Sequence, residues 1–556
     1  MSKINNFLYR FQYELFAALG AVIILWQMLL PGYVLTLDMV FGPNVAIPSY
    51  SGLSASTFLP SYLIYLLHFF LNSVVIEKVI LLLLFFVLLY IPLRVYPFQN
   101  KYGEAYFVSI FYTINPFVCE RFLAGQWEVL FAYAFLFPFV SSLIRFYREL
   151  SWHSILSACA WLLGIGMFSL HVLVMGTIIL ILYALGAAGR MLYLKETRMA
   201  RQFSTRLCVA LLLLVIASSY WLIPAFETRA SDVTSFSQAD WATFQTASDV
   251  HIGVLGNVTA LYGFWEEHER WVTFFLSPKA SMWLWGTSGV ALAALICLGI
   301  AVGLYHTRTR FLVALLCVIG FLALVFSAGV GQSVVQPLNL WLFEHIWFWR
   351  GFRDTEKWSG VLVLCYALFG GLSIEYLAKK LVKYKRAAAY LVLGACLLPL
   401  LYTPTILFGF EGQLQPVSYP PEWAQANNIL AQDTHCTALF LPWHQYYIPV
   451  FNNRVLTANT APSYFDCTII SSANAEVGDI TDQAGNTPQY YQIESAVTSN
   501  TADPDATVQL LRSMGVHYII FTNDQVYDDP YTYPFLHSTL LHVVVDNPPL
   551  VLFAIP

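Results

Sequence analysis

The chain has 556 residues, of which 58% are hydrophobic and only 11% are charged. A soluble globular protein carries roughly 25% charged residues, so this composition excludes a water-soluble protein and indicates an integral membrane protein. The formal net charge of −5 offers no excess of positive charge for nucleic acid, and we expect no nucleic-acid partner.

A membrane-spanning helix needs roughly 20 mostly apolar residues, and this criterion predicts eleven spans. They lie at 15–31, 74–93, 103–118, 128–146, 153–168, 170–190, 206–225, 281–304, 311–329, 358–378 and 387–404. A further apolar run at 57–72 is short and contains Pro60 and His68, so we expect it to lie along the membrane interface.

Lysine and arginine gather in alternate loops, for example at Arg145 and Arg148, at Arg308 and Arg310, and at 379–386. Cytoplasmic loops carry such an excess. We therefore expect a multi-pass protein of the cell (plasma) membrane with a cytoplasmic N-terminus and an extracytoplasmic C-terminal domain.

The periodicity changes near residue 405, where segments typical of a soluble domain begin. Amphipathic helices are predicted at 421–432 and 507–514, and strands at 436–441, 517–521, 541–545 and 550–554. We predict a transmembrane helical domain at 1–404, with outer loops 32–73, 226–280 and 330–357, and a small α/β domain at 405–556. Cys436 and Cys467 would then lie outside the cytoplasm and could form a disulfide.

Asp38 follows the first predicted span, in a segment too rich in glycine and proline to continue as a helix. It is either a solvated loop aspartate near the lipid headgroups or a functional carboxylate. Because it lies at the outer end of a span, Asp38 is the first candidate residue for chemistry on the outer side of the membrane.

A second group, Glu120 and Arg121 with Gln126 and Trp127, lies between the third and fourth spans. Glu120 and Arg121 form either a structural pair or part of a site. His171, at the next outer turn, is either an interfacial histidine with its hydrogen bonds satisfied or a substrate contact.

A third group is the run 266–270, which contains Glu266, Glu267 and His268 between two tryptophans. It is either a solvated, self-paired turn or a site for an acceptor sugar. Carboxylate oxygens would also suit a divalent cation there. No cysteine or histidine spacing indicates a zinc or haem site.

A fourth group, Arg350, Arg353 and Lys357, stands where an outer loop meets the tenth span. Arginine binds phosphate in a bidentate manner, and a helix N-terminus favours anions. The group is either a clamp for a lipid phosphate or a helix cap whose cations are neutralised by Asp354 and Glu356.

Three segments of the chain resemble the GT-C glycosyltransferases, and among them the cell-wall arabinofuranosyltransferases. They are LDMVFGPN around Asp38, RFLAGQWEVLFAYA from Arg121 to Ala134, and FRDTEKW from Phe352 to Trp358. The resemblance implies a polytopic helical GT-C fold and transfer of a sugar from a polyprenyl-phosphate carrier to an envelope glycan or glycolipid at the outer leaflet. The arabinose enzymes are far longer, so the resemblance leaves the sugar open.

Under this resemblance, Asp38 is the general base of an inverting transfer. Arg350, Arg353 and Lys357 bind the donor phosphate. The second and third groups and His171 remain candidates for acceptor or accessory roles. Two other classes stay open. A transporter or flippase of a lipid-linked or polar solute would show ionisable residues deep within spans, and a non-enzymatic membrane protein would only bind envelope polymers.

Overall fold

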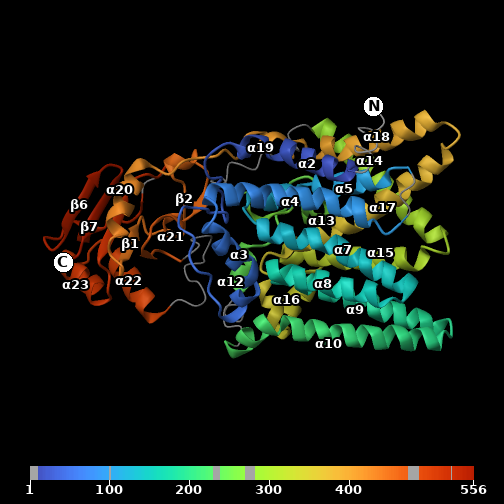
Figure 1. Ribbon diagram of the computed structural model, residues 1–556, viewed down its shortest axis with the longest axis horizontal. Coiled ribbons are helices and arrows are strands. Elements are labelled where there is room, and N and C mark those ends of the chain that lie inside the picture. The colour runs from blue at the N-terminus through green and yellow to red at the C-terminus, as the bar shows by residue number, and fades with distance from the viewer. Residues whose placement is uncertain (1–10, 99–101, 229–237, 269–281, 474–486, 527–528) are drawn as a thin grey trace.

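The structure, a computed structural model, describes residues 11–98, 102–228, 238–268, 282–473, 487–526 and 529–556. Figure 1 shows an elongated molecule with a helical bundle at one end and a smaller C-terminal domain with a β-sheet at the other. We call the end of the bundle that faces this domain the domain-facing end, and the opposite one the far end.

Within the described residues, nine helical segments are long and apolar enough to cross a membrane. They are α2 with the turn η1 (Gln12–Leu29), α4 (Ser73–Val95), α7 (Trp127–Glu149), α9 (Leu170–Tyr193), α10 (Thr197–Glu227), α14 (Met282–Tyr305), α15 (Arg310–Ala328), α17 (Ser359–Lys380) and α18 (Lys385–Tyr402). The chain is therefore a polytopic helical membrane protein, as its composition indicated.

Two of the eleven predicted spans take another form, so the count of eleven stays a prediction. The run 153–168 forms α8 (Trp152–Phe168), which is shorter than the nine, and the run 103–118 is divided into α5 (Glu104–Thr113) and α6 (Pro116–Leu123). Asn115 causes the division, because a residue before proline avoids the helical conformation and Asn115 is fully extended. Its side chain then caps α6 by accepting from the Val118 amide at 3.1 Å.

After this break, α6 lies in the protein interior, where all eight of its residues are buried. Other short elements of the helical part include the helices α3 (Phe58–His68), α12 (Gln238–Thr243), α13 (Gly253–Thr259) and α16 (Gln336–His345). The 3-10 turns include η2 (Gly52–Ser56), η3 (Trp265–His268), η5 (Gly329–Gly331), η6 (Trp347–Gly351) and η7 (Thr355–Trp358). The turn η7 leads directly into α17.

The C-terminal domain contains a five-stranded sheet in the order β4-β1-β5-β7-β6. Its strands are β1 (Thr437–Leu441), β4 (Thr468–Ile470), β5 (Tyr518–Thr522), β6 (His542–Asn547) and β7 (Leu550–Ala554). β1 runs parallel to β4 and β5, whereas β7 pairs antiparallel with β5 and β6. The predicted strands are confirmed, with small shifts at their ends.

Both faces of the central strands are buried, which explains their continuous apolar sequence. Phe440 and Ile520 lie in one apolar cluster with Trp423, and Leu439 and Ile519 lie in another cluster. The helices of this domain are α20 (Pro421–Leu430), α21 (Ala461–Tyr464), α22 (Pro488–Thr498) and α23 (Pro504–Ser513). The disulfide between Cys436 and Cys467, which the sequence allowed, joins the residues just before β1 and β4. The domain boundary near 405 stays a prediction.

The segment between α2 and α3 ties the two parts together. The Tyr33 amide and carbonyl both pair with Val417, at 2.8 Å each, and the Asn44 side chain donates to the Phe465 carbonyl at 2.7 Å. A Cβ on Gly42 would lie only 2.0 Å from the Ser463 carbonyl oxygen, so this approach requires glycine. The loop that carries Asp38 is therefore packed against the C-terminal domain.

Candidate functional site

The backbone around Asp38 is held from both sides. On the bundle side, the Asp38 amide donates to the Ala124 carbonyl at 3.1 Å. On the other side, the Ala458 amide donates to the Leu37 carbonyl at 2.8 Å. Ala458 belongs to β3 (Thr457–Ala458), which pairs with β2 (Tyr446–Tyr447) in a small hairpin of the C-terminal domain. Asp38 thus lies where the bundle and the domain meet.

The Asp38 carboxylate accepts one hydrogen bond from each part of the molecule. Gln126 Nε2, just before α7, donates to Oδ2 at 3.2 Å, and the Tyr446 hydroxyl donates to Oδ1 at 2.9 Å. The side chain stays exposed to solvent, which leaves it accessible to a substrate.

The protein around it still removes enough water to raise the pKa of Asp38 above its ordinary value. The hydrogen bonds from Gln126 and Tyr446 and the charges of Lys357 and Arg353 oppose this rise without cancelling it. The structure therefore brings Asp38 together with two cations of the fourth predicted group.

Arg121 is the centre of a buried ion cluster beside Asp38. Its guanidinium contacts the carboxylates of Asp354 and Glu356, and a further bond to Asp354 Oδ1 measures 3.0 Å. Lys357 Nζ lies 3.5 Å from Asp354 as well. Although burial alone would raise the pKa of Asp354, the charges of Arg121 and Lys357 outweigh it and hold this pKa below its usual range. The Phe264 ring covers the guanidinium at 4.7 Å.

A hydrogen-bonded path connects this cluster to Asp38. Arg121 Nη1 donates to Gln126 Oε1 at 2.9 Å, and Gln126 Nε2 donates to Asp38. Because a guanidinium has only donors, the Gln126 oxygen must face Arg121 and its NH2 group must face Asp38. Arg121 thereby fixes Gln126 as a donor to the carboxylate.

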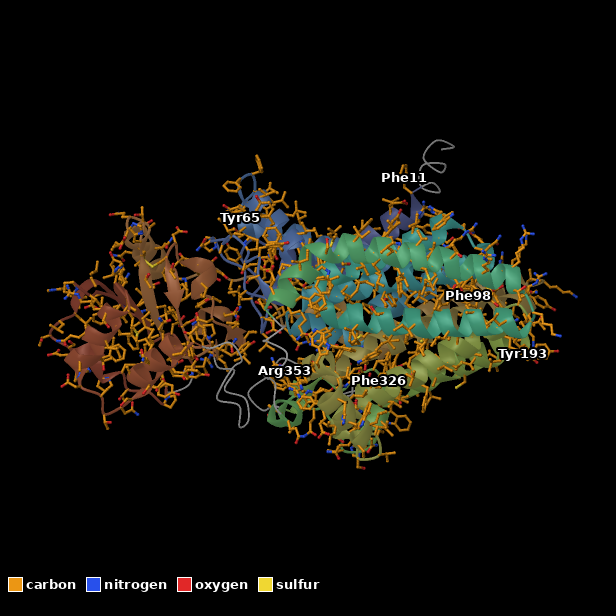
Figure 2. All side chains as sticks on the ribbon, turned by 90° about the horizontal axis from the view of Figure 1, so that it is seen from below. Phe11, Tyr65, Phe98, Tyr193, Phe326 and Arg353 are labelled. Atoms are coloured by element: carbon orange, nitrogen blue, oxygen red, sulfur yellow. A yellow bond between two sulfur atoms is a disulfide. The ribbon has the colours of Figure 1, made fainter. Side chains whose placement is uncertain are left out.

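The three cations of the fourth predicted group lie in different surroundings. Lys357 belongs to the ion cluster, while Arg353 lies over the Phe244 ring at 4.3 Å, at the domain-facing end (Figure 2). Arg350 lies over Phe343 of α16 at 5.5 Å and donates to its carbonyl at 3.3 Å. Arg353 and Lys357 are thus brought near Asp38, whereas Arg350 packs against α16.

The acidic residues of the second and third groups form a neighbouring cluster. Glu120 and Glu266 are 5% and 1% exposed. Burial, followed by the adjacent Glu267 carboxylate, raises the pKa of Glu120 well above its ordinary value. Glu267 accepts from the Asn257 side chain at 3.1 Å and from the Gly263 amide. Burial and the neighbouring carboxylate therefore both disfavour the charged form of Glu120.

Two further predicted residues have structural contacts. His171 Nε2 lies 2.8 Å from the Gly351 carbonyl oxygen, and Trp127 packs against Phe41 and Phe131 with ring centroids 6.2 and 6.1 Å apart. The side chain of His268 and residues 269 and 270 lie outside the described part of the chain. Within that part, no three histidine, cysteine or acidic side chains are grouped so as to hold a metal ion.

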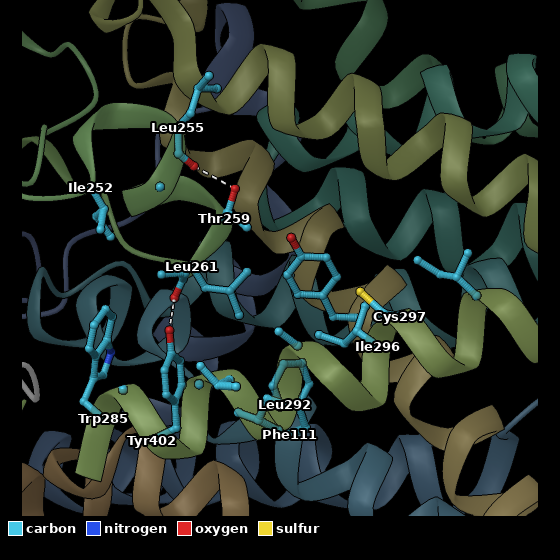
Figure 3. Close-up of a pocket in the computed structure, with 18 residues that line it drawn as sticks. Phe111, Ile252, Leu255, Thr259, Leu261, Trp285, Leu292, Ile296, Cys297 and Tyr402 are labelled. Atoms are coloured by element: carbon cyan, nitrogen blue, oxygen red, sulfur yellow. Dashed lines mark hydrogen bonds between the residues drawn. The ribbon is translucent and has the colours of Figure 1, made fainter. Parts of the chain in front are cut away.

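An apolar cavity of about 700 Å³ lies near the acidic cluster that contains Glu120 and Glu267. Figure 3 shows the residues that line this cavity. It is lined by α13, α14 and single residues of α5, α17 and α18, and the Tyr402 hydroxyl at its wall donates to the Ala260 carbonyl at 2.9 Å. The Tyr262 ring packs against Trp285 and Tyr402. Burial raises the pKa of Tyr262, and the neighbouring Tyr402 and Glu120 raise it further. The cavity and the carboxyl pair are therefore close neighbours.

Tyr446 is the contact that sequence analysis missed, since no local pattern singles it out among the 33 tyrosines. Gln126 lies within the RFLAGQW segment, but its role depends on Arg121 and Asp38 together. Under one of the two alternatives for the fourth group, Asp354 and Glu356 neutralise its cations, and the structure shows that Arg121 of α6 contacts both carboxylates.

Neither a protein-family model nor a curated protein sequence matches the chain. Several solved structures, however, are similar to it. The cryo-EM structure of the arabinofuranosyltransferase AftD from Mycobacteria aligns with 98% of this chain at a TM-score of 0.64 and 13% identity, and this chain covers 40% of that one. Its R1389S mutant (class 2) aligns with 98% of the chain at 0.59 and 12% identity, with 41% of that chain covered. Archaeal oligosaccharyltransferase AglB from Archaeoglobus fulgidus, in complex with an inhibitory peptide and a dolichol-phosphate, aligns at 0.38 and 11% identity, over 92% of this chain and 69% of that one.

The likeness to AftD extends over the helical bundle and the C-terminal domain, although the chain spans well under half of that protein's length. At 13% identity such a likeness concerns the fold. The chain therefore has the GT-C-like membrane fold that the three sequence segments led us to expect.

Proposed function

We propose that the protein is a membrane glycosyltransferase that moves a sugar from a polyprenyl-phosphate carrier to a glycan or glycolipid acceptor, with Asp38 as general base. The observation that carries the proposal is the meeting of an exposed carboxylate with a raised pKa, Asp38, and two cations, Arg353 and Lys357. Acid–base catalysis and the departure of a phosphate require these two kinds of group close together.

In the proposed reaction, an acceptor hydroxyl attacks the anomeric carbon of the donor sugar as the bond from this carbon to the phosphate oxygen breaks. The hydroxyl proton passes to Asp38, and the electron pair of the broken bond stays on the polyprenyl phosphate. Attack from the face opposite the phosphate inverts the anomeric centre. The raised pKa of Asp38 makes it a stronger base than an ordinary aspartate at neutral pH.

Arg353 and Lys357 are the proposed contacts of the leaving phosphate. Arg353 lies over the Phe244 ring, and this cation–π contact keeps the guanidinium in place. Arg121 lies deeper in the interior, where it contacts Asp354 and Glu356. It is a positioning residue that acts on Asp38 through Gln126.

The apolar cavity beside α13 and α14 supports a lipid-linked donor. Its lining is almost wholly hydrocarbon and aromatic, and it lies next to the carboxyl pair formed by Glu120 and Glu267. A polyprenyl chain is a suitable occupant, because burying its methyl and methylene groups there removes them from water. We propose Glu120, Glu266, Glu267, His268, His171 and Trp127 as acceptor-side or accessory residues.

The test is to incubate purified protein with a panel of polyprenyl-phosphate sugars and to measure the polyprenyl phosphate released. We expect release with one donor, and a loss of roughly 10²–10⁴-fold for Asp38→Asn, because a general base contributes about that much. Asp546→Asn, a substitution of an exposed aspartate of β6, is the matched control and should keep full activity. Normal turnover by folded Asp38→Asn protein would contradict the assignment.

A further inference from the structure

A basic recess lies at the far end of the bundle, away from the candidate site. It has a volume of about 940 Å³ and is formed where the ends of α7, α14 and α17 meet the segment after α4 and the turn between α14 and α15. Figure 2 shows Phe98, one of its lining residues, toward the end of the bundle opposite the C-terminal domain. This volume is at the upper end of the range that binds small ligands.

The charge of the lining is strongly positive. Four cations line the recess with a single carboxylate, and the five residues are Arg148, Arg308, Lys379, Lys380 and Glu375. All four cations are exposed. Repulsion among cations that surround one hollow is relieved by an anion inside it.

Two of the cations are held by aromatic rings and carbonyls rather than by acids. Arg148 lies over the Phe98 ring at 5.4 Å and donates to the Pro97 carbonyl at 2.6 Å, and Lys380 Nζ lies 4.5 Å from the centre of the Tyr376 ring. Neither a ring nor a carbonyl carries a full negative charge that would cancel these cations, although Glu149 acts on Arg148 from the next position in the chain. Among the residues that the structure describes, the side chains of Arg308 and Lys379 have neither an ion-pair nor a hydrogen-bond partner.

Helix ends explain only part of this arrangement. Lys379 and Lys380 lie in the last turn of α17, and Arg148 lies in the last turn of α7, where cations interact favourably with the negative end of a helix. Arg308 and His306 lie between helices, in the turn after α14, and still line the same recess. Cations from three separate segments of the chain therefore converge on one recess, as a binding site for an anion requires.

The wall next to the cations is apolar. Phe98, Val302 and Leu372 line the recess together with the charged residues. Because α14 and α17 are candidate membrane spans, the recess lies where spanning helices end, at the depth of lipid headgroups. A ligand there meets positive charge on one side and hydrocarbon on the other.

We propose that this recess binds a phosphate group, and that the group belongs to the headgroup of an anionic phospholipid whose acyl chains follow the apolar wall. Basic pockets between spanning helices bind such headgroups. Arg308 and Lys379 contact the phosphate, while Arg148 and Lys380 complete the positive surroundings. The site is independent of the proposed glycosyl transfer, and it would hold the ends of α7, α14 and α17 together at the far end.

The experiment compares lipid binding to the intact protein, purified in detergent, by native mass spectrometry. Phosphatidylglycerol and phosphatidylcholine with the same acyl chains are the probes. We expect the parent protein to retain phosphatidylglycerol preferentially and Arg308→Gln/Lys379→Gln to bind it roughly 30-fold more weakly, which is the effect of two cations at a lipid surface. Arg201→Gln/Lys385→Gln removes the same charge from exposed positions outside the recess and should bind like the parent.

A second arm separates the two sources of phosphate. The melting temperature of each variant is measured with inorganic phosphate and with phosphatidylglycerol at equal ionic strength. Stabilisation of the parent by the lipid alone, lost in Arg308→Gln/Lys379→Gln, is the expected result. Stabilisation by inorganic phosphate through the same two residues would keep the phosphate site and overturn its assignment to a lipid. Equal lipid retention by both double variants, or no preference for phosphatidylglycerol, would overturn the site itself.

Discussion

Two hydrogen-bond donors, the side-chain amide of Gln126 and the hydroxyl of Tyr446, hold the carboxylate of Asp38. Gln126 can only donate to it, because Arg121 occupies the amide oxygen. Tyr446 donates a hydroxyl, and burial together with the nearby Asp38 raises the pKa of this tyrosine well above its ordinary value, so it keeps its proton. Both neighbours favour the ionised form of Asp38 and limit the rise in its pKa that the surrounding protein causes by removing water.

Replacing Tyr446 by phenylalanine should therefore move the pH dependence of transfer. The substitution removes a hydrogen bond that stabilises the carboxylate, so the pKa of Asp38 rises further. A general base works only when deprotonated, and the acidic limb of kcat/KM should shift to higher pH while the rate on the alkaline side changes little. The measurement is a pH profile of polyprenyl phosphate release.

The matched control for this prediction is Tyr491→Phe, which removes the hydroxyl of an exposed tyrosine on α22, in the same domain. Its profile should coincide with that of the parent. An acidic limb that stays in place in Tyr446→Phe, or that moves to lower pH, would contradict the assignment of Asp38 as the base.

At the scale of elements, the site depends on the turn between α6 and α7. Gly125 has a φ of +76°, and a Cβ at this position would lie 2.4 Å from the Met39 amide nitrogen and 2.9 Å from that of Asp38. The turn can therefore support the Asp38 loop only with glycine here. The Asn115-Pro116 break sets this turn in place, since it directs α6 back into the interior.

We expect Gly125→Ala to reduce transfer by roughly 10²-fold, because a displacement of about 1 Å at a reacting group costs that much. The added methyl group would push the Asp38 loop away from Gln126. Gly189→Ala on α9, where nothing lies within 4 Å of the added atom, is the control and should leave activity unchanged. Comparable activity of the two variants, measured on protein of equal yield, would show that the loop does not depend on this contact.

Several elements could be predicted from the sequence because each depends on local composition. Apolar length identifies most spans, and runs such as 517–521 identify strands. The division of the 103–118 run could have been recognised at Asn115-Pro116, but its apolar character outweighed the single proline. Tyr446 could not be predicted, since it lies 408 residues from Asp38 and no pattern at either residue encodes a contact at that separation.

At the scale of the whole molecule, the two ends of the bundle differ in chemistry. The domain-facing end carries the Asp38 site, the buried ion cluster and the C-terminal domain, while the far end carries the basic recess. The positive-inside bias predicts that the far end is cytoplasmic and that the disulfide between Cys436 and Cys467 forms outside the cytoplasm.

Membrane-impermeant maleimide tests this orientation in intact cells. Asp546→Cys, in the C-terminal domain, should be labelled before lysis, and Lys385→Cys, at the start of α18, only after it. The parent protein reports any background from the native cysteines, two of which are exposed among the described residues, Cys208 and Cys297. Labelling in the opposite order would invert the topology and place the candidate site on the cytoplasmic face.

The bond from Tyr446 to Asp38 has a consequence for protein engineering. The hydroxyl comes from a hairpin of the C-terminal domain. A chimaera that takes this domain from another protein therefore also takes from that protein the side chain that contacts Asp38. A donor domain with an apolar side chain at that register would lack this hydrogen bond, and we expect it to weaken the proposed transfer at low pH. Exchange of the two halves between homologous proteins therefore has to preserve this phenolic oxygen as well as the backbone contacts with the Asp38 loop.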